Sequence, residues 1–186
     1  MYKDKTLLQY LDDLAGKLPA PGGGSASAAT AALGVALLSM VINFTLGKPK
    51  YAAHEKELTA SLRDCERLRN EFLRLVDEDV AAYSSKDLQR SLDVPLTVCR
   101  LAHEAARLCP VVCEKGNVNL ISDVAVAIAL MDAAFAGGYW NVDINLKLLK
   151  DNARSLAIRQ ELDGYQRMIK SIRHDTEVSV GKIIRG

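Results

Sequence analysis

A glycine-rich segment near the N-terminus is the first part of the sequence whose residue types suggest chemistry. It reads Pro19, Ala20, Pro21, Gly22, Gly23, Gly24 and Ser25. Consecutive glycines cost backbone entropy, so they indicate that the fold needs bare backbone here. Ser25 stands where a helix N-cap is expected, and a glycine loop that ends at a helix N-terminus presents free N–H groups and the positive end of the helix dipole. The segment therefore predicts a binding site for an anionic or carbonyl-rich group.

Asp79 is the side chain best suited to proton transfer. It lies four residues after Leu75 and four before Tyr83, on or beside the apolar stripe of a charge-rich helical segment. A carboxylate in such a position needs a partner, a ligand or a proton. A carboxyl group held between apolar helix faces can keep its proton near neutral pH, so Asp79 is a candidate general acid. Its neighbour Glu78 fits an ordinary solvated face.

Two more polar clusters interrupt the apolar pattern, over residues 116–123 and 141–146. Their candidate ligand-binding members are Asn117, Asn119, Ser122, Asp123, Asn141 and Asn145. Helix capping is the competing interpretation for most of these residues, and for Asp123 the two interpretations are equally open. Lys48 either contacts an acidic part of a ligand or marks the C-terminal end of a helix.

The elements that must position these groups are helices. Hydrophobic periodicity predicts helices over about residues 6–17, 25–46, 51–84, 95–115, 122–149 and 151–185. Short connections between long helices predict an all-α, up-and-down bundle in a single domain, residues 1–186. Pro95 is expected in the first turn of its helix, and Gly137 and Gly138 are expected where another backbone approaches closely.

The segment from Ser25 to Leu46 carries no charge and is long enough to span a bilayer. Its first half is mostly Ala, and Ser, Thr, Gly and Asn are scattered through it, which favours a central helix buried in protein over a membrane span. The other helices are too few to wrap it fully. We therefore expect a homodimer or a larger even-numbered oligomer that completes the bundle.

Composition excludes several classes of function. The 186-residue chain is 49% hydrophobic and 25% charged, with a net charge of +1 and no basic stripe, so neither a nucleic-acid partner nor a membrane is expected. The four cysteines form no C-x-x-C pair, and no metal site is expected. The N-terminus has no secretory signal, which predicts a cytoplasmic protein with reduced, mostly buried thiols.

Six motifs occur in a characteristic order. They are Pro-Ala-Pro-Gly-Gly-Gly-Ser (19–25), Thr-Leu-Gly-Lys (45–48), Val-Asp-x-Asp-x-x-Ala-Tyr (76–83), Val-Pro-Leu (94–96), Gly-Asn with Ser-Asp (116–123) and Asn-Val-x-Ile-Asn-Leu (141–146). Together they resemble the cyclodeaminase/cyclohydrolase family, which comprises the C-terminal half of formiminotransferase-cyclodeaminase and its stand-alone bacterial relatives. The resemblance covers most of the chain.

The resemblance implies a dimeric, all-α enzyme of one-carbon folate metabolism with a folate cleft near the subunit interface. The first expectation is a formiminotetrahydrofolate cyclodeaminase, an ammonia-lyase that converts 5-formiminotetrahydrofolate to 5,10-methenyltetrahydrofolate. The alternative enzyme is a methenyltetrahydrofolate cyclohydrolase. Asp79 matches the family's proposed proton donor, and Lys48 could meet the glutamate tail of folate. A tetrahydrofolate derivative is implied as substrate, with no tightly bound cofactor.

The sequence departs from the family near Asp79. Ala81 replaces the usual glutamate, and the connection between Tyr83 and Val94 is shorter than in typical members. These departures motivate an alternative from another class, a helical oligomer that binds a folate without turnover. The enzyme interpretation agrees with the chemistry, because the amine of the cyclisation intermediate leaves as ammonia only when an acid protonates it.

Overall fold

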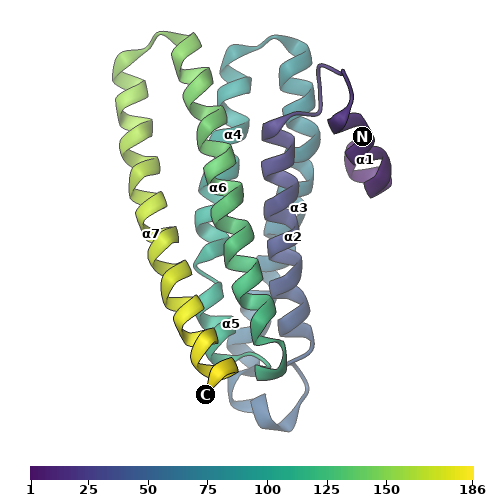
Figure 1. The fold of residues 1–186 in the computed structure, drawn as a ribbon, viewed down its shortest axis with the longest axis vertical. Coiled ribbons are helices and arrows are strands. Elements are labelled where there is room, and N and C mark those ends of the chain that lie inside the picture. The colour runs from purple at the N-terminus through teal and green to yellow at the C-terminus, as the bar shows by residue number, and fades with distance from the viewer.

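The computed structural model describes residues 1–186 and contains helices and turns throughout. Its α-helices are α1 (Leu7–Ala15), α2 (Gly23–Asn43), α3 (Glu55–Ser85), α4 (Leu88–Ala106), α5 (Cys109–Lys115), α6 (Ile121–Leu149) and α7 (Asn152–Arg185). Short 3-10 turns cover Tyr2–Asp4, Pro49–His54 and Val118–Leu120. The long helices run up and down side by side, and α1 lies outside the bundle at one end (Figure 1). The predicted all-α bundle is confirmed.

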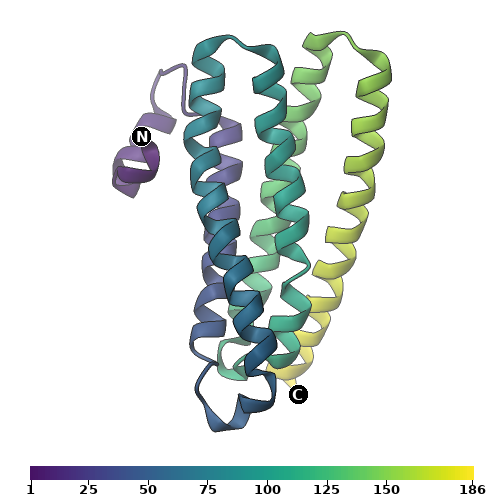
Figure 2. The ribbon, with the colours of Figure 1, turned by 180° about the vertical axis from the view of Figure 1, so that it is seen from behind.

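The bundle has two layers around the core. Helices α2 and α6 lie side by side in one layer, and the view from behind shows α3 and α4 in the other (Figure 2). Helix α7 packs on the outer side of α6 and α4. Small residues bring α2 and α6 close together, since a Cβ atom on Gly34 would lie 3.0 Å from the carbonyl oxygen of Ala127.

Helix α2 is central but not enclosed. Ala28, Ala31, Val35 and Leu38 are fully buried, whereas Leu33 on the opposite side remains 60% exposed. This outward stripe of α2 is apolar, which explains why the sequence lacks a polar face there. The single chain therefore leaves one side of its core helix open to solvent.

The first turn of α2 differs from the prediction. The helix begins at Gly23 with Gly22 as its N-cap, so Ser25 lies within the first turn and is fully buried. Ser25 is not the N-cap because its backbone N–H and its hydroxyl both have other partners, Asp79 and Tyr10. The predicted glycine loop is thus largely a helix start made of bare backbone.

The start of α4 also differs. Asp87 caps a helix that begins at Leu88, and Pro95 lies inside that helix instead of in its first turn. A proline removes the N–H that would bond the carbonyl four residues earlier, which here is Ser91. The side-chain amide of Asn145 donates to that carbonyl at 2.7 Å and so replaces the missing bond. The helix ends at Ala106, and Pro110 occupies the first turn of the separate α5.

The paired glycines of α6 lie at close approaches, as predicted. A Cβ atom on Gly138 would lie 2.8 Å from the sulfur of Cys99 and 3.4 Å from the carbonyl oxygen of Pro95, both in α4. A Cβ atom on Gly137 would lie 2.3 Å from the hydroxyl oxygen of Ser27 in α2. These positions let α6 contact both of its neighbours.

Two helical segments, Gly23–Asn43 and Val118–Leu149, are long and apolar enough to cross a membrane by length and composition alone. Both are packed within the bundle. Core helices of water-soluble proteins pass the same test, so this property is weak evidence for a membrane span.

The N-terminal segment docks against the upper ends of α2 and α3. The backbone N–H of Tyr2 donates to the carboxylate of Asp77 in α3. The hydroxyl of Tyr10 lies 3.1 Å from that of Ser25, and the rings of Tyr2 and Tyr10 meet edge to face at 5.6 Å. Thr6 caps α1 by accepting from the N–H of Gln9. The segment therefore covers one side of the α2–α3 junction.

Candidate active site

A cleft of about 340 Å³ opens where α2, α3, α4 and α6 meet, at the end of the bundle near the start of α2. It is lined by Pro19, Ala20, Gly22, Gly23, Gly24, Asp79, Ala82, Tyr83, Ser91, Asn141, Ile144 and Asn145. Residues far apart in the sequence thus supply one glycine wall, one carboxyl group and two amides. The structure brings together Asp79 with five of the predicted binding residues, Gly22, Gly23, Gly24, Asn141 and Asn145.

Bare backbone at the start of α2 holds the carboxyl group of Asp79. Oδ2 accepts a hydrogen bond of 2.9 Å from the backbone N–H of Ser25. A Cβ atom on Gly24 would lie 2.1 Å from Oδ1, so no other residue fits at position 24 unless Asp79 moves. The helix N-terminus also places its positive dipole end toward this carboxyl group.

Burial raises the pKa of Asp79 above its ordinary value, and the N–H of Ser25 opposes only part of that shift. Burial also raises the pKa of the Tyr10 phenol, which the nearby Asp79 charge raises further. A carboxyl group with a raised pKa can hold a proton closer to neutral pH than an exposed aspartate can. The site therefore contains a candidate acid that can also act as a base once it is ionised.

The two cleft asparagines have structural partners as well. Asn141 donates to the carbonyl oxygen of Gly137 at 2.8 Å, and a Cβ atom on Gly23 would lie 3.2 Å from the amide nitrogen of Asn141. Asn145 donates to the carbonyl oxygens of Ser91 and Asn141. Their amide nitrogens are thus fixed by backbone, while each side chain also borders the cleft.

Of the six other predicted binding residues, Ser25 is buried and reaches Asp79 through its backbone N–H, and the remaining five do not line this cleft. Lys48, Asn117, Asn119, Ser122 and Asp123 lie at the opposite end of the bundle, beyond the end of α2 or at the start of α6. Helix α2 has 21 residues, so about 30 Å of helix separates the two ends. Asn117 donates to the carbonyl oxygen of Phe44 and caps a 3-10 turn. Within one chain these residues cannot touch a molecule held beside Asp79.

Several cleft residues went unrecognised as site residues in the sequence. Tyr83, which is 61% exposed, lines the cleft together with Ile144, Ser91 and Ala82. Tyr83 follows Asp79 by one helical turn, so its spacing could have placed it near the same site. Ser91 offers no such signal, because it reaches the cleft only through the packing of α4 against α6.

The protein has no group of three or more His, Cys, Asp and Glu side chains that could hold a metal ion. All four cysteines are buried and unpaired, as predicted for their packing. The groups that the cleft offers to a ligand include the Asp79 carboxyl group, the backbone at the start of α2 and the amides of Asn141 and Asn145.

Comparison with known proteins identifies the family. The formiminotransferase-cyclodeaminase family model matches residues 6–86 and 84–164. The methenyltetrahydrofolate cyclohydrolase of Methylorubrum extorquens is 35% identical over 88% of this chain and 90% of its own length. The formimidoyltransferase-cyclodeaminase of Rattus norvegicus is 29% identical over 80% of this chain, which spans only 32% of that larger protein.

A solved structure agrees with the sequence comparisons. The crystal structure of formiminotetrahydrofolate cyclodeaminase from Thermotoga maritima superimposes with a TM-score of 0.94 at 27% identity. It matches 99% of this chain and 100% of the solved chain. The matches span nearly the whole bundle, including the glycine turn and Asp79. The chain therefore belongs to the formiminotransferase-cyclodeaminase family.

Proposed function

We propose that this protein is an enzyme of one-carbon folate metabolism whose reaction takes place beside Asp79. The observation that carries the proposal is a half-buried carboxyl group with a raised pKa, held against a glycine helix start in the cleft. Its membership of the family supplies the substrate class, because relatives are named for reactions of methenyl- and formiminotetrahydrofolate.

Hydrolysis of the methenyl bridge is the first reaction that this site supports. Water adds to the bridge carbon, and ionised Asp79 takes one proton of that water as the C–O bond forms. Asp79 then returns the proton to the ring nitrogen as its bond to carbon breaks. The hydroxyl on that carbon releases its own proton to solvent, which leaves a formyl group on the other nitrogen. Before attack, the carboxylate also stabilises the cationic bridge.

Ammonia-releasing cyclisation is the second reaction. The N10 nitrogen of 5-formiminotetrahydrofolate attacks the formimino carbon, and its proton passes to the formimino nitrogen, which gives a tetrahedral carbon that bears an amine. Protonated Asp79 gives its proton to that amine, the C–N bond breaks, and ammonia leaves as the methenyl bridge forms. Both reactions pass through a tetrahedral intermediate at the bridge carbon, which bears a hydroxyl group in hydrolysis and an amine in cyclisation, so one acid–base residue serves either.

The relatives favour hydrolysis as the principal reaction. The cyclohydrolase relative is 35% identical and matches along 90% of its length, whereas the cyclodeaminase relatives of Rattus norvegicus and Sus scrofa are 29% and 30% identical. The solved cyclodeaminase from Thermotoga maritima is 27% identical and matches along its entire chain, so cyclisation stays the second candidate.

One experiment separates the candidates. Purified protein is mixed with methenyltetrahydrofolate or with 5-formiminotetrahydrofolate, and the methenyl absorbance is followed together with ammonia release. With methenyltetrahydrofolate, a methenyl absorbance that decays faster than without protein identifies a cyclohydrolase. With 5-formiminotetrahydrofolate, a methenyl absorbance that grows faster than without protein, with one ammonia released per methenyl group, identifies a cyclodeaminase. Folate binding without turnover of either substrate would support the non-catalytic alternative and contradict the proposed enzyme.

We further propose that the protein forms a homodimer, or a larger even-numbered oligomer, through the open face of α2 and α6. Several residues of these helices that reach solvent are apolar: Leu33 and Val126 are exposed, and Leu37, Met40 and Leu130 are partly exposed. Exposed apolar residues that gather on one face are typical of a protein–protein interface. Light scattering that shows a monomer at micromolar concentration would contradict this proposal.

Two copies can pack through this face with their helices antiparallel, related by a two-fold axis that is perpendicular to the helices. Such an antiparallel dimer would place Asn117, Asn119, Ser122 and Asp123 of one copy near the Asp79 cleft of the other, with Lys48 close by. We propose that these residues serve the site from the second subunit. The proposal accounts for polar residues that lie about 30 Å from the cleft in their own chain.

Mixed dimers test this arrangement. Asp79→Asn and Asp123→Asn are each expected to be impaired when assayed alone. After the two are unfolded and refolded together, half of the dimers are mixed, and each mixed dimer has one intact site. Activity should return to about a quarter of the wild-type value. Full activity of Asp123→Asn alone, or no recovery on mixing, would show that Asp123 does not act across the interface.

The proposed compartment is the cytoplasm. Four buried, unpaired cysteines are compatible with a reducing environment, where thiols stay reduced. Cells can be fractionated and each fraction tested for this protein and for a cytoplasmic marker protein. Finding this protein in a fraction that lacks the marker would contradict the assignment.

A further inference from the structure

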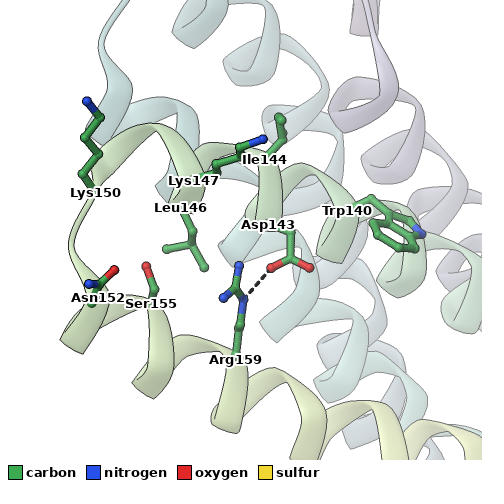
Figure 3. A pocket seen from close by; sticks show the side chains of 9 residues that line it. All are labelled: Trp140, Asp143, Ile144, Leu146, Lys147, Lys150, Asn152, Ser155 and Arg159. Atoms are coloured by element: carbon green, nitrogen blue, oxygen red, sulfur yellow. Dashed lines mark hydrogen bonds and ion pairs between the residues drawn. The ribbon is translucent and has the colours of Figure 1, made fainter.

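Two hollows outside the Asp79 cleft differ in charge. The hollow at the turn between α6 and α7 is basic, with Lys147 and Lys150 beside the ion pair of Arg159 and Asp143 (Figure 3). A second hollow, of about 440 Å³, lies between α5 and α7 and has two carboxylates and no basic side chain in its lining. Figure 1 shows these two helices next to each other at the end of the bundle opposite the start of α2. We call this second space the acidic hollow.

The two carboxylates of the acidic hollow have no counter-charge. Glu114 in α5 and Asp175 in α7 are both exposed, and neither forms an ion pair. The neighbouring Lys115 is paired with Glu57 instead. Two negative charges that line one space repel each other, so a cation bound between them is favoured. The complete lining is Pro110, Cys113, Glu114, Val118, Asp175, Thr176, Ser179 and Ile183.

A buried hydroxyl group also belongs to the lining of the acidic hollow. Thr176 is only 3% exposed, and its Oγ1 is buried without a hydrogen-bond partner. A buried polar atom that lacks a partner costs free energy and calls for a partner from outside the chain. An N–H donor bound in the hollow would supply that partner. The hydroxyl of Ser179 donates to the carbonyl oxygen of Asp175 at 2.9 Å, so its oxygen can still accept a hydrogen bond.

The groups in the acidic hollow suit an aliphatic amine better than a metal ion. Mg²⁺ and Ca²⁺ prefer about six or more oxygen ligands, and the hollow offers two carboxylates. An ammonium group needs at most three acceptors, which carboxylate and hydroxyl oxygens provide. Pro110, Val118 and Ile183 add apolar surface that suits a chain of methylene groups. Because the two carboxylates stand on different helices, a ligand with an ammonium group at each end can meet both.

We propose that the acidic hollow binds an aliphatic diamine, with one ammonium group at Glu114, the other at Asp175, and Thr176 accepting a hydrogen bond from one of them. The bound diamine joins α5 to α7 and therefore raises the thermal midpoint of unfolding. Each contact between exposed charges adds modest affinity and weakens as salt concentration rises. The site is separate from the proposed folate site, because it lies at the other end of the bundle from Asp79.

Calorimetric titration with 1,4-diaminobutane tests the proposal, and 1-aminobutane serves as the ligand that lacks the second charge. We expect one diamine to bind per chain, roughly fivefold more tightly than the monoamine at low salt. Glu114→Gln and Asp175→Asn should each abolish this preference, and because both residues are exposed the fold should persist. Asp12→Asn is the matched control and should keep the preference, because Asp12 is an exposed carboxylate in α1 that forms no ion pair.

Thr176→Val separates a ligand contact from a structural role. Valine has nearly the same shape, and the hydroxyl has no partner within the protein, so the variant should be at least as stable to urea as wild type. Its affinity for the diamine should fall by about threefold to tenfold. Unchanged affinity in this variant would overturn the role of Thr176. The site itself would be overturned by equal wild-type affinity for the two amines, by equal losses in Asp12→Asn and Asp175→Asn, or by Mg²⁺ that binds as tightly as the diamine.

Discussion

A Cβ atom on residue 24 would lie 2.1 Å from Oδ1 of Asp79, so the carboxyl group occupies the space that any other side chain would need. The next residue, Ser25, donates its backbone N–H to Oδ2 at 2.9 Å. The glycine turn and the acid are therefore one structural unit. This unit gives a physical reason for glycine at position 24, which lies in a helical turn where alanine would otherwise be preferred.

Gly24→Ala should inactivate the enzyme without unfolding it. The added methyl group must displace the Asp79 side chain, and misplacing a catalytic group by about 1 Å can cost on the order of 10²-fold in turnover. Gly164→Ala is the control, since nothing lies within 4 Å of a Cβ atom there. That change should leave turnover unaltered and raise the free energy of unfolding by about 0.5–1 kcal/mol. Wild-type turnover in Gly24→Ala would show that the position of Asp79 does not matter.

Tyr10→Phe tests whether the N-terminal segment supports the site. It removes the hydroxyl that lies 3.1 Å from that of Ser25 and should lower the free energy of unfolding by about 1 kcal/mol. Because Ser25 also holds Asp79, we expect turnover to fall as well, by roughly threefold to tenfold. Tyr139→Phe removes a hydrogen bond to Asp163 on the α7 side and should reduce stability alone. If Tyr10→Phe and Tyr139→Phe had equal turnover, the hydroxyl of Tyr10 would have no part in supporting the catalytic site.

The raised pKa of Asp79 has a consequence for stability. The folded protein holds this proton more tightly than the unfolded chain, so the group favours folding at low pH, and this contribution is lost as pH rises through the folded pKa. Asp79→Asn resembles the protonated form. The variant's stability relative to wild type should therefore increase as pH rises from about 3.9, the ordinary pKa of aspartate, and level off above the raised pKa.

Urea unfolding of both proteins between pH 4 and pH 8 measures this difference. Subtracting the two curves removes the contributions of all other titrating groups that the substitution leaves unchanged. A difference that stays constant with pH, or that favours wild type more strongly at high pH, would mean that burial does not raise the pKa of Asp79.

Much of the fold could be predicted because its signals are local. The spacing of apolar residues indicates the long helices, and the last of them, predicted over 151–185, spans Asn152–Arg185 with Asp151 as its N-cap. Gly137 and Gly138 were expected at close approaches because glycine within a helix has a cost that packing must justify. Asp79 stands out in the sequence because a carboxylate on an apolar stripe needs a partner, a ligand or a proton.

The errors arose where tertiary contacts override local preference. Ser25 has the right type for an N-cap, but Asp79 and Tyr10 occupy its donors and acceptors. Pro95 was expected in a first turn, yet Asn145, 50 residues later in the sequence, bonds the carbonyl that Pro95 leaves free and allows a helix interior. Pattern alone also could not reveal that residues 116–123 and Asp79 lie at opposite ends of the bundle, since that depends on the direction of each helix.

Steady-state turnover of Asp79→Asn shows whether Asp79 transfers the proton in this cleft. Asparagine keeps the shape of the side chain but cannot deliver the proton, so kcat on the active folate substrate should fall by a factor on the order of 10² or more. Folate affinity measured by titration should persist. Asp77→Asn is the matched control, because Asp77 binds the N-terminal segment at Tyr2 and does not line the cleft. Near-wild-type turnover in Asp79→Asn, or a larger loss in Asp77→Asn, would contradict the assignment.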